Sequence, residues 1–159
     1  MFTDNILPHL HSKVMFILTF IGILFSLGCQ FGKKPERVLN KENSLCFQAI
    51  DGNDTAYMEL DTSTYEIIGK MRFFYADSNQ YVGDFKGEIK GDTLTGFYDF
   101  QSNSSEKWHR NPVSFLKQGS EWIMGDGKFV LIWGSGYFDP KVPINYSQAK
   151  FKFKAIPCP

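Results

Sequence analysis

The chain has 159 residues, 43% of them hydrophobic and 16% aromatic, and its 17 Lys and Arg side chains balance 17 Asp and Glu. A chain without net charge has no global field to attract polyanions, so its composition argues against nucleic-acid binding. Its length suits one folded domain with a single core.

An uncharged apolar segment lies near the N-terminus. Residues 14–27 follow Lys13, contain no charged side chain, and lead through Gly28 to Cys29. A short apolar run between a basic residue and a small residue is typical of a cleaved export signal. The segment resembles the lipobox of bacterial lipoproteins, whose cysteine receives a diacylglycerol thioether before cleavage. The resemblance implies that residues 1–28 are a signal peptide and that Cys29 is the first mature residue, carrying acyl chains such as palmitate.

Two other interpretations of this segment are a transmembrane helix and an ordinary secretory signal with a free thiol at Cys29. A helix that crosses a bilayer needs about 20 apolar residues, more than this run supplies. Each buried methylene contributes about 0.8 kcal/mol, so several acyl chains on one cysteine would hold the protein on a membrane. We therefore expect a lipid anchor in the cell envelope, at the periplasmic face of the outer membrane, with the inner membrane and the cell surface as alternatives.

Residues 29–43 follow the signal and are polar and charged, with Gly32 and Pro35 and little periodicity. Such a segment is typical of a flexible tether. We expect one β domain over residues 44–159.

The cysteine count supports this division of the chain. Three cysteines in an oxidising compartment leave one unpaired unless another reaction consumes a thiol. Acylation of Cys29 would consume it and leave Cys46 and Cys158 to form a disulfide that joins the two ends of the domain. The alternative is a pair of buried free thiols.

From residue 45 onward, short alternating runs are separated by turn residues. In residues 81–90, Phe85, Gly87 and Ile89 share one face, and charged side chains occupy the other. This period of two indicates a half-buried strand. The other predicted strands cover residues 46–50, 55–60, 65–75, 94–100, 106–117, 121–124, 128–133 and 151–155.

About eight or nine strands without an amphipathic helix predict an all-β fold. We expect an antiparallel up-and-down meander of about eight strands, closed or nearly closed into a barrel, which is lipocalin-like by architecture only. Closure would remove exposed sheet edges. Residues 134–148 contain Pro140 and Pro143 and are predicted to form a long loop.

The sequence Gly-Asp-Thr-Leu at residues 91–94, within a strand–turn–strand pattern over residues 87–102, resembles a group of small uncharacterised bacterial lipoproteins. Residues 113–117, 125–127 and 157–159 extend this similarity. The resemblance implies a β-rich periplasmic domain, and it supplies neither an activity nor catalytic residues.

No motif in the sequence indicates catalysis, a metal site or a cofactor. His109 is the single histidine after residue 28, and it lies in a predicted strand without zinc-ligand spacing. We interpret it as a solvated strand residue, and the Asp51–Asp54 segment as a hairpin turn rather than a calcium loop. We expect a protein that is not an enzyme.

The aromatic residues supply the remaining hypotheses. Aromatic side chains bury large apolar areas, and an eight-stranded barrel is either filled by side chains or holds one small ligand. A packed core is one interpretation, and a cavity for a small apolar ligand is another. The residues that would line such a cavity are Phe73, Tyr75, Phe85, Tyr98, Phe100, Phe115 and Trp122.

A third interpretation is an exposed patch that binds an envelope protein. Its candidate residues are Trp108, Arg110, Trp133, Tyr137 and Phe138, because aromatic side chains and arginine are common interface anchors. We expect a membrane-anchored binding domain for an apolar small molecule or a protein, with the membrane lipid bound through Cys29. The alternative is a structural, envelope-maintenance lipoprotein without a ligand.

Overall fold

The computed structural model describes residues 38–159. The predicted signal peptide, the lipidation site Cys29 and most of the predicted tether lie outside the described residues. The described chain forms the strands β1 (Ser44–Asp51), β2 (Asp54–Asp61), β3 (Ile67–Phe74), β4 (Gln80–Lys90), β5 (Thr93–Ser102), β6 (Ser105–Gln118), β7 (Glu121–Met124), β8 (Phe129–Ile132), β9 (Ser135–Phe138) and β10 (Lys152–Ile156).

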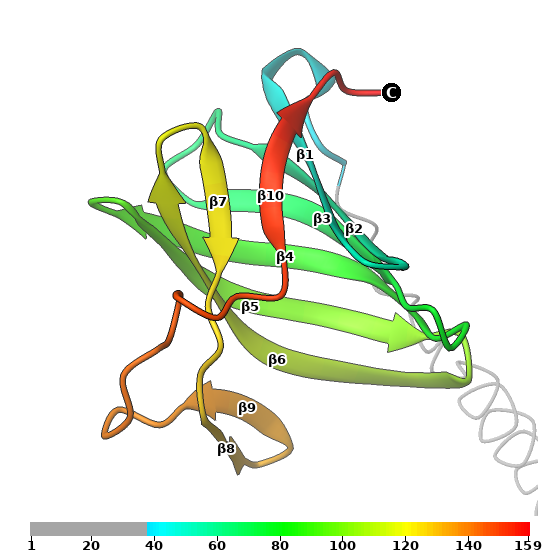
Figure 1. Ribbon diagram of the computed structural model, residues 1–159, viewed down its shortest axis with the longest axis vertical. Coiled ribbons are helices and arrows are strands. Elements are labelled where there is room, and N and C mark those ends of the chain that lie inside the picture. The colour runs from blue at the N-terminus through cyan, green and yellow to red at the C-terminus, as the bar shows by residue number, and fades with distance from the viewer. Residues whose placement is uncertain (1–37) are drawn as a thin grey trace, which may run out of the picture. The chain divides into compact units, whose positions relative to one another are not determined.

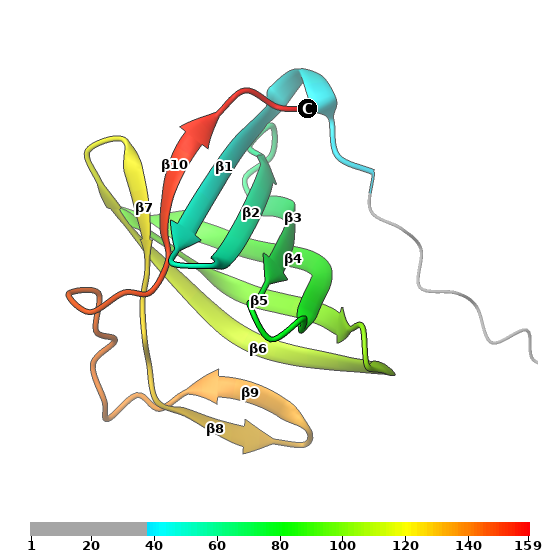
Figure 2. The same cartoon turned by 45° about the vertical axis from the view of Figure 1, so that its right-hand side comes forward.

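Eight of these strands form a closed antiparallel barrel in the order β1-β10-β7-β6-β5-β4-β3-β2 (Figures 1 and 2). Strands β1 to β7 follow one another around the barrel, and β10 fills the position between β7 and β1. The predicted up-and-down meander barrel is therefore confirmed. Among the described residues, no helix is long and apolar enough to cross a membrane.

The period of two places the apolar residues inside. In β3, Ile67, Gly69, Met71 and Phe73 are buried, whereas the residues between them are exposed or only partly buried. The turns between β1 and β2 and between β4 and β5 contain Gly52 and Gly91, with φ of +58° and +59°, a conformation that L side chains disfavour.

Side chains fill the centre of the barrel. Phe85, Phe115 and Phe153 are fully buried, and the ring of Phe115 contacts both others at centroid distances of 6.3 and 5.7 Å. Trp122 belongs to the same core. Within residues 38–159, every buried side-chain nitrogen or oxygen has a hydrogen-bond partner. The interior is thus a packed core in its central part.

The β1–β10 seam closes the barrel. These two strands pair over three positions, from Cys46 opposite Ile156 to Gln48 opposite Lys154. The predicted disulfide between Cys46 and Cys158 is confirmed, with a Cα–Cα distance of 5.1 Å across a sequence separation of 112. It clasps the seam at the end where the chain enters the barrel.

The start of the domain differs from the predicted boundary at residue 44. Lys41–Asn43 form a short 3-10 turn capped by the side chain of Asn40. The backbone N–H of Asn40 donates to the buried carboxylate of Asp61 at 2.9 Å. The last residues of the predicted tether are therefore attached to the barrel by hydrogen bonds.

The chain after β7 departs most from the prediction. Strand β8 pairs only with β9, and this hairpin lies outside the barrel with β9 on the side of β6 (Figures 1 and 2). The predicted loop over residues 134–148 is wrong in its first part, because Ser135–Phe138 form β9. A two-residue turn, Trp133-Gly134, is enough to reverse the chain and complete this hairpin, and the prolines follow only after β9 has ended.

Candidate binding surface

A groove of about 620 Å³ lies on the outer face of the barrel, beneath the β8–β9 hairpin. Its barrel wall consists of outward-facing residues of β4, β5 and β6, including Phe97 and Pro112. Its hairpin wall consists of Tyr137 and Phe138, and the rings of Phe97 and Tyr137 meet edge to face at 5.6 Å. Tyr65 lies at the rim and is almost fully exposed. Five apolar or aromatic side chains from four segments of the chain thus converge in one hollow.

Glycine lets the hairpin approach β6 closely. A Cβ at the buried Gly136 would lie 2.9 Å from Cδ of Pro112 and 3.3 Å from the carbonyl oxygen of Arg110. Any larger residue would therefore push β9 away from β6. The groove depends on this close contact because β9 supplies its second wall.

Ion pairs neutralise the charged side chains around the groove. The guanidinium of Arg110 donates to Asp99 from both Nε and Nη2, at 2.5 and 2.8 Å. It also lies 5.5 Å from the centroid of the Phe97 ring. The hydrogen bond to Asp99 raises the pKa of Arg110, so this pair stays ionised. Lys86 forms a second ion pair at the groove, through one contact of its ammonium with Glu66 at 2.8 Å. The groove is therefore apolar in its middle and internally charge-balanced at its edges.

A second, smaller hollow of about 220 Å³ occupies the mouth of the barrel. Pro112 and Phe138 line both hollows, so the hairpin separates them. The walls of the mouth are mainly aromatic, and the rings of Tyr98 and Phe100 stack at 4.8 Å. Burial raises the pKa of Tyr98, whose hydroxyl donates to the carbonyl oxygen of Met71.

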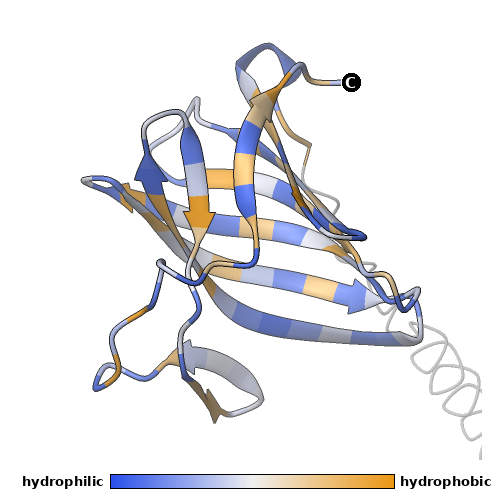
Figure 3. Ribbon diagram, in the orientation of Figure 1, coloured by the Kyte–Doolittle hydropathy of each residue, from blue (hydrophilic) through white to orange (hydrophobic). Residues whose placement is uncertain are grey.

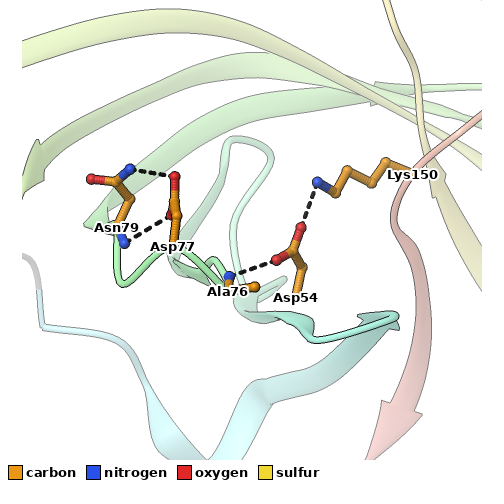
Figure 4. Close-up of polar contacts among 5 residues, drawn as sticks. All are labelled: Asp54, Ala76, Asp77, Asn79 and Lys150. Carbon is orange, nitrogen blue, oxygen red and sulfur yellow. Dashed lines mark hydrogen bonds and ion pairs between the residues drawn. The ribbon is translucent and has the colours of Figure 1, made fainter.

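A cluster of polar contacts connects chain segments at the mouth of the barrel (Figure 4). Asp54, at the start of β2, accepts from Lys150 and from the backbone N–H of Ala76. The hydrogen bond from Lys150 is the main reason why the pKa of Asp54 is lowered. The ammonium of Lys150 also lies 5.0 Å from the centroid of Tyr75. Asp77 accepts two hydrogen bonds from Asn79 in the adjoining turn.

The hairpin carries an exposed apolar strip, which we define as Phe129–Ile132 together with Trp133. All four residues of β8 are exposed, Leu131 at 71%, and Trp133 at the tip is fully exposed. Figure 3 shows β8 in hydrophobic colours beside a nearly neutral β9. Contiguous exposed apolar surface larger than a few hundred Å² is rare on a monomeric domain and is typical of interaction sites.

The predicted cavity residues divide into two groups. Phe73, Tyr75, Tyr98 and Phe100 line the mouth hollow. Phe85, Phe115 and Trp122 do not line this hollow and lie deeper in the same buried core, which also includes Phe73, Tyr98 and Phe100. The rings of the first group therefore form the part of the core that borders a small opening, whereas the rings of the second group fill the centre of the barrel.

The predicted partner patch is also divided. Arg110, Tyr137 and Phe138 line the groove together. Trp133 lies at the hairpin tip, and Trp108 lies on β6 two residues before Arg110, half exposed. The structure therefore brings three of the five residues into one hollow.

The residues considered for other chemistry lie apart. His109 is exposed and stacks on Phe100 at 5.4 Å. Asp51–Asp54 close the first hairpin as predicted. Within residues 38–159, no three His, Cys, Asp or Glu side chains are placed to hold a metal ion.

Phe97, Pro112 and the strip residues Phe129–Ile132 were missed by the sequence interpretation, which had identified only Trp133 of the strip. Phe97 lies between Thr95 and Asp99 on the outward face of β5, and an aromatic residue on a polar face is a signal that could have revealed the groove. The strip has no such signal, because a short uninterrupted apolar run resembles a buried strand.

The chain is thus a small closed antiparallel β-barrel with an external hairpin and an apolar groove on its outside. Comparison with protein-family models, curated proteins and solved structures finds no match for this chain.

Proposed function

We propose that this protein is a lipid-anchored extracytoplasmic domain that acts by binding a partner protein on the outside of its barrel. The proposed address comes from the apolar segment that ends at Cys29. The proposed activity comes from the groove, which would receive an aromatic or aliphatic side chain of the partner between Phe97, Pro112 and Tyr137.

One observation carries this proposal: the barrel interior is filled, whereas unfilled apolar surface lies outside it. The central rings of the barrel are fully buried against one another, so no large ligand has room there. The outer groove offers about 620 Å³ with a neutralised rim. Interfaces of this kind anchor aromatic or aliphatic groups in pockets surrounded by polar residues.

The mouth hollow supports a second candidate function, the binding of a small apolar molecule. Its volume of about 220 Å³ and its aromatic lining would accept a compact ring. It is smaller than the 300–1,000 Å³ typical of ligand pockets. We therefore place a small-molecule ligand second.

The address is tested by the intact mass of the protein purified from membranes of the producing cell. We expect a mass that lacks residues 1–28 and is raised by acyl chains on Cys29. An unmodified N-terminus at Met1 would contradict the anchor. A small molecule that copurifies in equal amount would favour the mouth hollow as the binding site.

The groove is tested with a photo-crosslinking residue at Tyr65 in the full chain, expressed in the producing cell. We expect an adduct of one defined protein partner, and we expect it to weaken when Tyr137 is changed to Ser. The same crosslinker at Ile50, exposed on β1, is the matched control. Equal adducts from both positions, or none from Tyr65, would favour a structural role without a specific partner.

A further inference from the structure

The outer edge of β8 lacks the features that normally protect an edge strand. Within residues 38–159, no strand pairs with this edge, because β8 pairs only with β9. Phe129–Ile132 contain no charge, no proline and no bulge, and the whole segment 129–138 is uncharged. Exposed, flat and apolar edges of this kind pair with another strand.

The turn of the hairpin adds an independent observation. Trp133 has a φ of +52° and Gly134 a φ of +79°, as a two-residue type I′ turn requires, and asparagine is the usual residue at the first position. Tryptophan in this conformation is strained, and its side chain is fully exposed. Because Trp133 buries no surface in the isolated fold, nothing within this domain offsets the strain of its backbone. Strained residues of this kind are typical of contacts with another molecule.

The geometry of the hairpin determines which backbone groups face outward. Ile132 and Ser135 flank the two-residue turn and are opposite one another, so they form the hydrogen-bonded pair that closes it. Because the pattern alternates, Val130 also directs its N–H and C=O toward β9. Phe129 and Leu131 direct theirs toward the free edge.

We infer that the free edges of β8 from two copies of this chain pair antiparallel about a twofold axis at Leu131. A hydrogen-bonded pairing must match outward-facing residues with one another, and Leu131 opposite its own copy satisfies this requirement. Val130 then lies opposite Ile132 of the other copy. Phe129 and Trp133 of the two copies become cross-strand aromatic neighbours, a pairing that stabilises sheets.

The exposed area is sufficient for such a dimer. One fully exposed tryptophan and four partly exposed apolar residues offer on the order of 600 Å² in each copy. Pairing would remove at most roughly 1,200 Å² from water, which places the contact at the small end of specific interfaces. A reversible dimer is therefore expected.

The position of the hairpin favours a second copy over a lipid surface. The chain enters the barrel next to the Cys46–Cys158 disulfide, and the hairpin lies beside β6, away from this entry point in both views (Figures 1 and 2). The hairpin is therefore distant from the end of the barrel at which the proposed anchor would attach. The inferred contact does not involve the groove, so it stands or falls separately from the proposed function.

Cysteine crosslinking in the full chain, expressed with its own leader, tests this register. Leu131→Cys should form a disulfide-linked homodimer under mild oxidation, because opposed residues of a hydrogen-bonded pair have Cα atoms about 5.5 Å apart. Val130→Cys alone should crosslink far less, whereas coexpression of V130C with I132C chains should restore the crosslink. Val82→Cys, half exposed on the outer face of β4, is the control for random collisions.

Three results would overturn the inference. The first is that Leu131→Cys crosslinks no more than Val82→Cys, and the second is that it forms an adduct with a different protein. The third is that Leu131→Cys does not crosslink and is shielded from a water-soluble maleimide, as a lipid contact would predict. A second measurement requires no cysteine. The unmodified chain extracted in mild detergent should sediment as a dimer and Leu131→Lys as a monomer, and a monomeric unmodified chain would refute the pairing.

Discussion

Lys150 and Asp54 form an ion pair with an Nζ–Oδ2 distance of 2.5 Å. Lys150 lies two residues before β10, and Asp54 is the first residue of β2. The two positions are distant in sequence and lie on either side of the barrel seam. The same ammonium packs over the ring of Tyr75, so one side chain links three segments at the mouth.

This ion pair predicts a dependence of stability on pH. The pKa of Asp54 is lowered in the fold, mainly by the hydrogen bond from Lys150. A lowered folded pKa stabilises the protein at pH values above the unfolded value of 3.8, and this contribution is lost as the pH falls through the folded value. Asp54→Asn should therefore lose less stability than the unmodified chain between pH 5 and pH 2, as measured by urea unfolding. Asp92→Asn, in an exposed turn, is the carboxylate control, and equal acid sensitivity of the two variants would contradict the prediction.

The disulfide should contribute a large part of the stability. A crosslink between residues 112 apart restricts the unfolded chain and contributes about 4 to 5 kcal/mol in the chain-entropy description. The Cys46→Ser/Cys158→Ser double variant should lose stability of this size in denaturant unfolding, and reductant should no longer affect it. In the wild-type protein, if Cys29 is acylated as proposed, thiol labelling after unfolding without reductant should find no free sulfhydryl. Two labelled thiols would show that the bridge is not formed.

The packed centre of the barrel predicts a contrast between buried and exposed aromatic residues. Phe115→Ala removes a fully buried ring that contacts Phe85 and Phe153, so it should destabilise the domain by about 3 to 5 kcal/mol. Tyr65→Ala, at an almost fully exposed position, should change the free energy of unfolding by less than about 0.5 kcal/mol. Similar losses for the two variants in thermal or chemical unfolding would argue against a filled interior.

The hairpin tip predicts a stabilising substitution. Asn tolerates a positive φ better than Trp, whose φ is +52° at position 133. Trp133→Asn should therefore stabilise the isolated domain by about 0.5 to 1 kcal/mol. Trp133→Val, with a β-branched side chain that disfavours this conformation, should not stabilise it. A loss of stability in W133N would show that the indole makes intramolecular contacts.

The strand pair β4–β5 predicts a site that tolerates no side chain. A Cβ at Gly96 would lie 2.2 Å from the carbonyl oxygen of Lys86, so the two strands would have to separate. Gly96→Ala should destabilise the barrel by about 1 to 3 kcal/mol. At Gly52, the added Cβ meets no atom within 4 Å, but φ is +58°. Gly52→Asn should be nearly neutral because asparagine adopts this conformation. Hydrogen exchange should therefore show faster exchange of the β4 and β5 amides in Gly96→Ala and unchanged exchange of these amides in Gly52→Asn.

The alternation of side chains made the barrel predictable. In β4 and β5, the apolar face is regular enough to show which residues point inward, and glycine marks the turn between them. The pairing of Cys46 with Cys158 followed from counting thiols. Both inferences depend on local properties, the period of a strand and the valence of sulfur.

The candidate surface was less predictable because a pattern shows which residues share a face and not what covers that face. Phe85 and Tyr98 both point inward and belong to the buried core, yet only Tyr98 also lines the mouth hollow. Likewise, the apolar run of β8 is consistent with a buried strand, and only its pairing with β9 places it outside the barrel.

The sequence by itself determined the class of fold and the disulfide, because these depend on residue type and spacing, and it is the sole basis of the proposed anchor. Only the tertiary structure decided that the barrel is filled and that its free apolar surface is a groove and a strand edge outside it. The physical reason is that burial depends on the approach of segments distant in sequence, such as Gly136 against Pro112, and no local pattern records such a contact.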